Sequence, residues 1–238
     1  LFLPRDAGAL AVGADAVAAA LQAAAQSRGV ELALTRTGSR GLYWLEPMLE
    51  VATPSGRIAY GPLEPGDAET LLEALLGQGA HPRRLGPPGE IDFLRRQTRL
   101  TFARCGITDP LSLGDYRAHG GLRGLARAQS LGAAETVEEV VRSGLRGRGG
   151  AGFPTGIKLR TVAAAAGAPK YVVCNADEGD SGTFSDRMIM EGDPFVLLEG
   201  MAITALATGA SQGYIYVRSE YPHAIATLDA ALLLARAD

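Results

Sequence analysis

The carboxy-terminal part of the chain alternates strand-like and helix-like segments, and this order limits the fold more than any other feature. "KYVVCNADEG" starts with a continuous apolar run, as a buried parallel strand does, and "QGYIYVRSEY" predicts a second strand. Between them, "DPFVLLEGMAITALATGA" predicts a buried helix, and "PHAIATLDAALLLARA" predicts another helix at the end. A strand–helix–strand–helix order predicts a right-handed parallel crossover in an α/β fold.

The amino-terminal part predicts a smaller α/β unit. Strands are expected in "LFLPRD" and "VELALTRTG", with the helix "GADAVAAALQAAAQSRG" between them. In "MLEVATPSGRIAYG", two alternating runs flank a turn and predict a β-hairpin, and "DAETLLEALLGQG" predicts a helix after it. This order is typical of a thioredoxin-like domain.

Breaker residues indicate the domain boundaries. "AHPRRLGPPGE" is rich in proline and glycine and marks the end of the first domain near residue 90. Residues 91–133 are expected to form a connector with separate helical segments. Residues 134–238 are expected to form the second domain.

Composition excludes several classes of protein. The net charge of −3 provides no basic excess for nucleic acid, and no apolar stretch is long enough to span a bilayer. Cys105 and Cys174 are the only cysteines, so neither a disulfide framework nor a four-cysteine metal site is expected. No metal ligands are predicted, and a reducing cytoplasm is the expected compartment.

A glycine-rich, cationic stretch, "GLRGRGGAGFPTGIKL", spans residues 144–159. Gly147 to Gly152 match G-x-G-x-x-G, but a helix precedes them and Pro154 interrupts the segment after them, so the dinucleotide fingerprint lacks its strand–loop–helix context. Glycines still let the backbone approach a planar ring or a phosphate. Arg148, Phe153 and Lys158 add two cations and a stacking face, which favours a ligand site over a mobile surface loop.

An acidic loop, "CNADEGDSGTFSDR", comes after the first strand of the second domain. Ligands bind beyond the carboxyl ends of strands in open parallel sheets, so the loop is a second candidate site. Asn175, Asp177, Glu178 and Asp180 suit hydroxyl and amide groups of a ligand. The spacing does not match a calcium loop. For Glu178, the alternative is a strand-end carboxylate bound by local N–H groups.

The two loops, together with "LLEG" and "YIYVRSEYP", resemble the flavin-binding subunit shared by respiratory complex I, NAD-reducing hydrogenases and NAD-dependent formate dehydrogenases. The resemblance covers about Val137 to Ala226. Three segments are most similar to the formate dehydrogenase β subunit: "GSRGLYWLEPMLEV", "RQTRLTFARCGITDPLSLGDY" and "EGDSGTFSDRMIMEGDPF". The implied fold is a thioredoxin-like domain followed by the first part of a Rossmann-like FMN-binding domain.

The resemblance implies which residues hold the two cofactors, FMN and NAD. The implied FMN contacts are Gly147, Arg148, Gly149, Lys158, Asn175, Asp177 and Glu178. The implied NAD contacts are Phe153, Glu178 and Asp180, with Phe153 stacking on the nucleotide. A second stacking aromatic of the family falls on Thr161 in this chain, and no catalytic side chain beyond the flavin itself is implied.

The chain also departs from the family. The family's flavin domain continues beyond residue 238 and is followed by a cluster-binding helical region, so this chain is expected to hold about half of a flavin pocket. Iron–sulfur clusters are expected only in that further region or in partner subunits. The first domain offers no cluster cysteines, because "TGSRGLYW" contains none and Cys105 stands alone beyond it.

The function implied is that of a diaphorase subunit. It would exchange a hydride between NAD(H) and FMN and pass single electrons to iron–sulfur clusters. The sequence similarities to the β subunit favour a cytoplasmic formate dehydrogenase. Its implied partners are a molybdenum/iron–sulfur catalytic subunit and a small two-iron subunit. The alternatives are the same role in a NAD-reducing hydrogenase or complex I, a non-catalytic docking module, and a plain NAD-binding domain without flavin.

Overall fold

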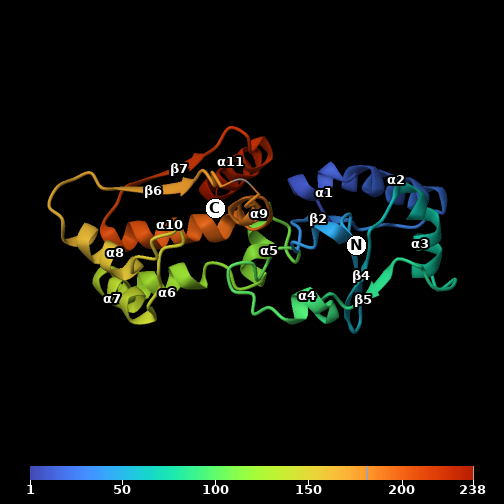
Figure 1. Cartoon of the computed structure of the whole chain (residues 1–238), viewed down its shortest axis with the longest axis horizontal. Helices are drawn as coiled ribbons and strands as arrows, with labels where there is room; N and C mark the ends of the chain where they lie inside the picture. The colour runs from blue at the N-terminus through green and yellow to red at the C-terminus, as the bar shows by residue number, and fades with distance from the viewer. Residues whose placement is uncertain (181, 238) are drawn as a thin grey trace.

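The computed structural model describes residues 1–180 and 182–237, which form two lobes joined by a connector (Figure 1). The strands of the first lobe are β1 (Phe2–Pro4), β2 (Thr35–Thr37), β3 (Leu49–Thr53), β4 (Gly56–Tyr60) and β5 (Arg84–Gly86). Its helices are α1 (Ala7–Ala11), α2 (Ala14–Ser27), α3 (Ala68–Leu75) and α4 (Asp92–Arg95).

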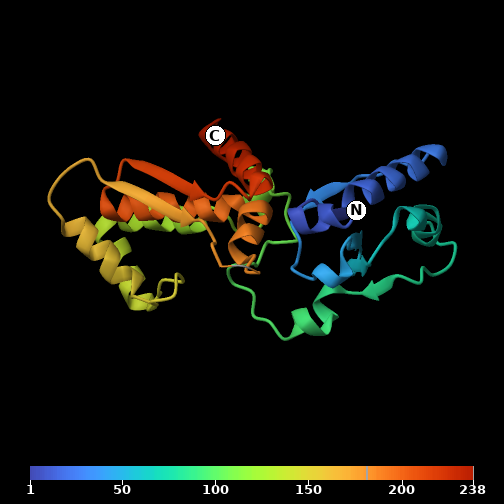
Figure 2. The same cartoon turned by 45° about the horizontal axis from the view of Figure 1, so that its top comes forward.

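The second lobe is mostly helical. Its helices are α5 (Leu113–Ala118), α6 (Arg123–Leu131), α7 (Ala133–Ser143), α8 (Thr155–Ala164), α9 (Ser185–Gly192), α10 (Pro194–Thr208) and α11 (Pro222–Ala237). Its two strands are β6 (Tyr171–Ala176) and β7 (Gln212–Val217). Figure 2 shows the lobes side by side, with the segment that contains α4 running below the first lobe toward the second.

The first sheet has the order β2-β1-β3-β4-β5. β1 and β2 are parallel, whereas β3, β4 and β5 pair antiparallel with their neighbours. A parallel βαβ unit beside a hairpin and a final helix is the thioredoxin-like arrangement, so this prediction is confirmed. The predicted hairpin is also confirmed, with Thr53 paired to Gly56 across the turn.

Helices α2 and α3 bury the first core. Apolar side chains at helical spacing on α2, such as Val17 and Leu21, pack with Leu71 and Leu72 of α3 against Leu3 and Leu49 of the sheet. The strand predicted in "VELALTRTG" is too long, because only Thr35–Thr37 pair with β1.

The other face of the first sheet is covered by residues from both sides of the predicted boundary at residue 90. Leu94 of α4 and Ile91 pack with Leu42, Met48 and Ala59. The start of the connector therefore contributes to a second apolar cluster of the first lobe, while the boundaries at 90 and 133 stay a prediction.

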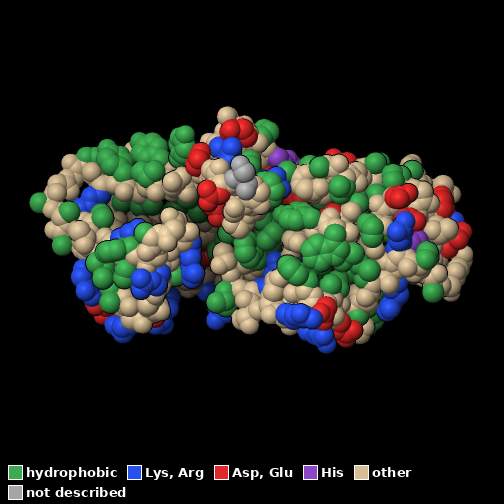
Figure 3. All heavy atoms as spheres, in the orientation of Figure 1, with side chains coloured by type: hydrophobic (Ala, Val, Ile, Leu, Met, Phe, Trp, Pro, Cys, Tyr) green, Lys and Arg blue, Asp and Glu red, His purple; other side chains and the backbone are tan. Residues whose placement is uncertain are grey.

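Strands β6 and β7 pair in parallel from Tyr171 opposite Gln212 to Ala176 opposite Val217, as the alternating order predicted. The prediction that β6 is buried on both faces is wrong. Tyr171, Val173, Tyr214 and Tyr216 are 50–66% exposed on one face, which forms a hydrophobic surface over the two strands (Figure 3). The described helices pack against the opposite face, through residues such as Ala176 and Leu228.

Helix α10 was predicted to be buried, and this holds only for its ends. Phe195 and Ala207 are buried, whereas most residues between them are partly exposed. α10 contacts α6, α7 and α8 as well as both strands. Its Glu199 carboxylate accepts hydrogen bonds from the backbone N–H groups of Leu122 (2.8 Å) and Leu125 (2.9 Å), and so fixes the start of α6.

The lobes meet around the end of α9. The backbones approach so closely there that a Cβ on Gly38 would lie 2.4 Å from Gly192 Cα. The Ala7 N–H donates to Glu191 Oε2 at 2.7 Å, and Arg104 Nε of the connector donates to Asp193 Oδ2 at 2.8 Å. Among the described residues, no helix has both the length and the apolar character needed to cross a membrane.

Candidate functional site

The glycine-rich stretch forms a closed loop between two helices. α7 ends at Gly144, whose φ of 66° is readily adopted only by glycine. Gly147 N–H donates to the Phe153 carbonyl at 2.9 Å, and Thr155 N–H donates to the Leu145 carbonyl at 2.8 Å. The loop therefore returns on itself and leads directly into the first turn of α8.

The loop brings together a cation, an aromatic ring and bare backbone. Lys158 Nζ lies 5.9 Å from the centre of the Phe153 ring and 3.8 Å from the position of a Cβ on Gly147. Phe153 is 46% exposed. Within residues 1–180 and 182–237, no carboxylate pairs with Lys158 or Arg148. Unpaired cations beside an open glycine backbone at a helix N-terminus are suited to an anion with a planar group.

The acidic loop begins where β6 ends, at the same end of the sheet as the residues after β7. Asp177 N–H donates to Asn175 Oδ1 at 3.2 Å. Asn175 also lines a small cavity of about 150 Å³, together with Cys174 and Asp186. Burial raises the pKa of Asp186, and the nearby Glu178 raises it further. Cys174 is partly buried on the helix-covered face of β6, where it packs against the cluster that contains Ala176.

Glu178 has a structural role in the loop. Its carboxylate accepts hydrogen bonds from the N–H groups of Asp186 (2.9 Å) and Arg187 (2.8 Å), which lie in the first turn of α9. Its backbone is in the left-handed region at φ 43°. The structure therefore shows this carboxylate bound by local N–H groups, and its oxygens are partly occupied by α9.

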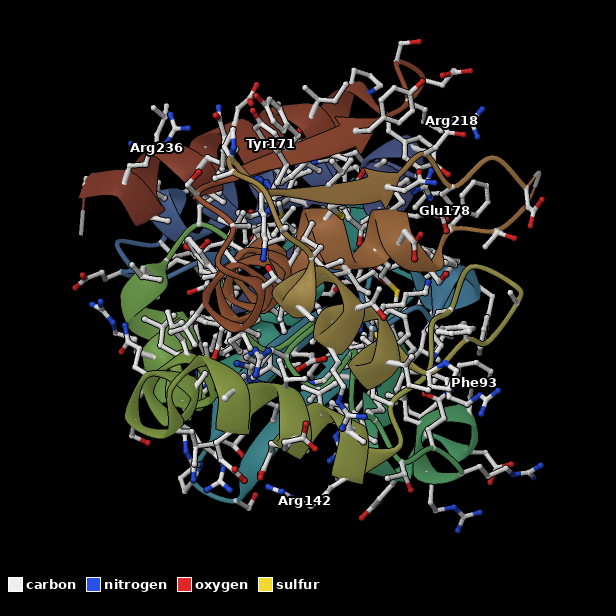
Figure 4. All side chains as sticks on the ribbon, turned by 90° about the vertical axis from the view of Figure 1, so that its left-hand side faces the viewer. Phe93, Arg142, Tyr171, Glu178, Arg218 and Arg236 are labelled. Atoms are coloured by element: carbon white, nitrogen blue, oxygen red, sulfur yellow. The ribbon has the colours of Figure 1, made fainter. Side chains whose placement is uncertain are left out.

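Arg218 is a further residue of this site that the sequence reasoning did not single out. It comes directly after β7, and its Nη1 donates to the Glu178 carbonyl at 2.9 Å. Its guanidinium also lies 5.3 Å from the centre of the Tyr221 ring. Figure 4 shows Arg218 and Glu178 close together at the ends of the two strands. Arg218 could have been found from its position directly after a parallel strand, because the same kind of position identified the acidic loop as a candidate ligand site.

The predicted site residues thus fall into two groups. Phe153, Lys158 and Gly147 contact one another in the glycine loop, and Asn175, Asp177 and Glu178 lie together after β6. No hydrogen bond or ion pair joins the two groups among the described residues. Thr161 lies where the resemblance implies a second stacking aromatic. Its hydroxyl donates to the Ile157 carbonyl of its own helix at 2.9 Å.

The fold and these loops define an α/β domain with a candidate cofactor site. Residues 140–238 match the model of the Nuo51 FMN-binding domain family.

Three curated relatives match overlapping parts of the chain. The NADP-reducing hydrogenase protein HndC of Solidesulfovibrio fructosivorans is 50% identical over 138 residues, which cover 58% of this chain and 28% of that protein. A subunit of the NADH-quinone oxidoreductase of Rhizobium meliloti is 50% identical over 127 residues, covering 53% and 30%. A subunit of the NADH-quinone oxidoreductase of Escherichia coli is 42% identical over 141 residues, covering 56% and 30%.

The chain spans 28–30% of the length of these relatives. A crystal structure of NAD⁺-reducing [NiFe]-hydrogenase in the air-oxidized state aligns with 99% of this chain and 40% of that chain. The TM-score of this alignment is 0.47, at 22% identity.

Proposed function

We propose that the second domain holds FMN and NAD(H) and takes part in hydride exchange between them. The observation that carries this proposal is Lys158, without a carboxylate partner among the described residues, beside Phe153 and Gly147 in a loop that matches the Nuo51 FMN-binding domain model. The donor set suits the ligands: cations and backbone N–H groups for phosphate, and Asn175 and Asp177 for hydroxyls. When bound, FMN accepts two electrons as a hydride and releases them singly.

The chain's own residues would bind and position the ligands. Gly147, Arg148, Gly149 and Lys158 would hold FMN from the glycine loop. Asn175 and Asp177 would bond its phosphate-ribityl region from the acidic loop, with Glu178 near the ring. In this assignment Phe153 stacks on the nicotinamide nucleotide and Asp180 contacts it. Holding the two rings in contact, at about 3–3.5 Å, is the main catalytic requirement, since hydride transfer needs no acid–base side chain.

The finer proposal is a place in an NAD-dependent formate dehydrogenase. It rests on the resemblance of the first domain's sequence, and of "EGDSGTFSDRMIMEGDPF", to the formate dehydrogenase β subunit. The partners would then be a molybdenum/iron–sulfur subunit and a small two-iron subunit in the cytoplasm. Subunits of a hydrogenase or of complex I are the alternatives, and mass spectrometry of the co-purifying subunits distinguishes them through molybdenum or nickel.

The test is the visible spectrum of the protein, purified with its partner subunits, before and after NADH under anaerobic conditions. We expect flavin bands that bleach with NADH. Replacing Lys158 with Gln should lower flavin occupancy, because it removes a phosphate contact. The matched control is Lys170→Gln, since Lys170, the other lysine, donates to the Ala163 carbonyl away from the loop.

Two outcomes would contradict the proposal. A complete assembly that releases no flavin on denaturation would favour the docking-module alternative. Equal loss of flavin in the Lys158 and Lys170 variants would remove Lys158 from the site.

Glu178→Gln tests both roles of this residue. We expect a loss of about 0.5–2 kcal/mol in the free energy of unfolding, because a neutral amide caps the first turn of α9 less well. If Glu178 also lies near the flavin ring, removing its charge should make the flavin midpoint potential more positive. Chemical denaturation and a redox titration measure the two effects. An unchanged potential would restrict Glu178 to its capping role, and Glu31→Gln, the same change at an exposed position of the first lobe, is the control.

A further inference from the structure

A second cleft lies where the first lobe, the connector and the start of α9 meet. It has a volume of about 380 Å³. Its lining includes two arginines and four aromatic residues: Arg40, Tyr43, Phe93, Arg99, Phe102 and Phe184. None of the residues assigned above to FMN or NAD lines it, although Gly182, Phe184 and Ser185 of its lining belong to the acidic loop.

The cleft has an excess of positive charge. Arg99 Nη1 donates to the Arg40 carbonyl at 2.9 Å, and Arg99 Nε is buried with no hydrogen-bond partner among residues 1–180 and 182–237. Arg40 donates from both Nε and Nη2 to the buried Glu50, and Arg57 shares that carboxylate, so two arginines face one acid. No described residue that lines the cleft carries a carboxylate. Such a site attracts an anion, and the planar guanidinium donors suit phosphate.

The cleft also exposes aromatic rings. Phe93 is 47% exposed, and Tyr43 and Phe184 are also exposed to solvent. Trp44 packs edge-on against Phe93, with ring centres 5.2 Å apart, and extends the aromatic surface. Figure 3 shows hydrophobic side chains gathered between the two lobes in this region. Exposed rings beside arginines are the partners on which a nucleobase stacks.

We propose that this cleft binds a nucleoside phosphate, with Arg40 and Arg99 pairing with the phosphate and the aromatic rings stacking on the base. The ligand combines the two features that the lining requires: a planar ring and a multiple negative charge. The volume falls within the range of about 300–1,000 Å³ that small-molecule sites occupy. The site is additional to the proposed hydride-transfer site and does not depend on it.

The experiment measures ADP binding to the protein, purified with its partner subunits, at saturating NAD⁺, which blocks the nicotinamide nucleotide site. We expect saturable binding to remain. Photolabelling with 2-azido-ADP should mark peptides that contain Tyr43, Phe93 or Phe102. Arg99→Gln should weaken ADP binding by about tenfold or more, because it removes a charge-assisted phosphate contact.

Two variants keep the result interpretable. Arg96→Gln removes the same charge three residues away on the surface, where Arg96 pairs with Asp92, and should leave ADP affinity unchanged. Phe93→Ala, at an exposed position, should weaken binding by loss of stacking without unfolding the lobe.

Three results would overturn the proposal. One is that no saturable ADP binding remains at saturating NAD⁺. Another is ADP binding that both Arg99→Gln and Phe93→Ala leave intact. The third is pyrophosphate binding as tight as that of ADP, because it would show that the rings contribute nothing.

Discussion

Replacing Arg104 with Met is expected to lower the free energy of unfolding by about 3–5 kcal/mol at pH 8. The side chain of Asp193 is 1% exposed, and Arg104 is its ion-pair partner at 2.8 Å. The arginine also lies 4.7 Å from the centre of the Tyr116 ring, so its loss removes packing as well. Removing the cation leaves a buried carboxylate without compensation, at the junction between the connector and α10.

The cost of this substitution should depend on pH. Burial raises the pKa of Asp193 from 3.8 to about 6, even though Arg104 opposes the shift. A carboxyl whose folded pKa is raised contributes stability that is present below its unfolded pKa and is lost as the pH rises through the folded value. Without Arg104 the folded pKa rises further. The variant should therefore lose more stability at pH 8 than at pH 5.

Urea unfolding at pH 5 and pH 8 measures this difference. The double variant Arg104→Met with Asp193→Asn should recover much of the loss, because no buried charge remains. Arg95→Met is the matched control, since its pair with Asp92 is exposed and is expected to contribute less than about 1 kcal/mol. An equal loss at both pH values would show that packing, and not the buried charge, determines the effect.

Gly38→Ala is expected to separate the lobes and to cost about 1–3 kcal/mol. The added Cβ would lie 2.4 Å from the Cα of Gly192. This is a backbone atom, so no rotamer change can relieve the contact. The lobes must then shift apart, which would weaken the Ala7–Glu191 hydrogen bond between them. Unfolding curves and small-angle scattering measure the two consequences: lower stability and a larger radius of gyration.

Gly89→Ala is the control for this substitution. A Cβ there would meet nothing within 4 Å, so stability should change by no more than about 0.5 kcal/mol. If the Gly38 variant matched the Gly89 variant in both measurements, the close approach at Gly38 would not hold the lobes together.

Much of the local structure could be predicted from short-range patterns. The hairpin β3–β4 is predicted by two alternating runs around "TPSG", and α2 is predicted by apolar spacing that ends near Gly29. The glycine loop was located because Arg148, Phe153 and Lys158 stand among glycines. These signals lie within a few residues of one another, so the chain near each position is sufficient to determine them.

Features that depend on distant segments were missed or predicted wrongly. The exposed face of β6 could not be predicted, because an apolar run does not tell whether helices cover one face or two. Whether Glu178 faces a ligand or caps a helix was left open by the sequence. The structure places its carboxylate against the N–H groups of Asp186 and Arg187 at the start of α9.

The sequence alone determined the order of the elements, the thioredoxin-like first domain and the two loops that carry the candidate site. It could do so because turns, caps and periodicity are local properties of the chain. Only the tertiary structure decided that Gly38 meets Gly192, that Arg104 neutralises Asp193, and that Arg40 and Arg99 share a cleft with Phe93 and Phe184. These contacts join segments far apart in sequence, and their partners are fixed by how the two lobes pack.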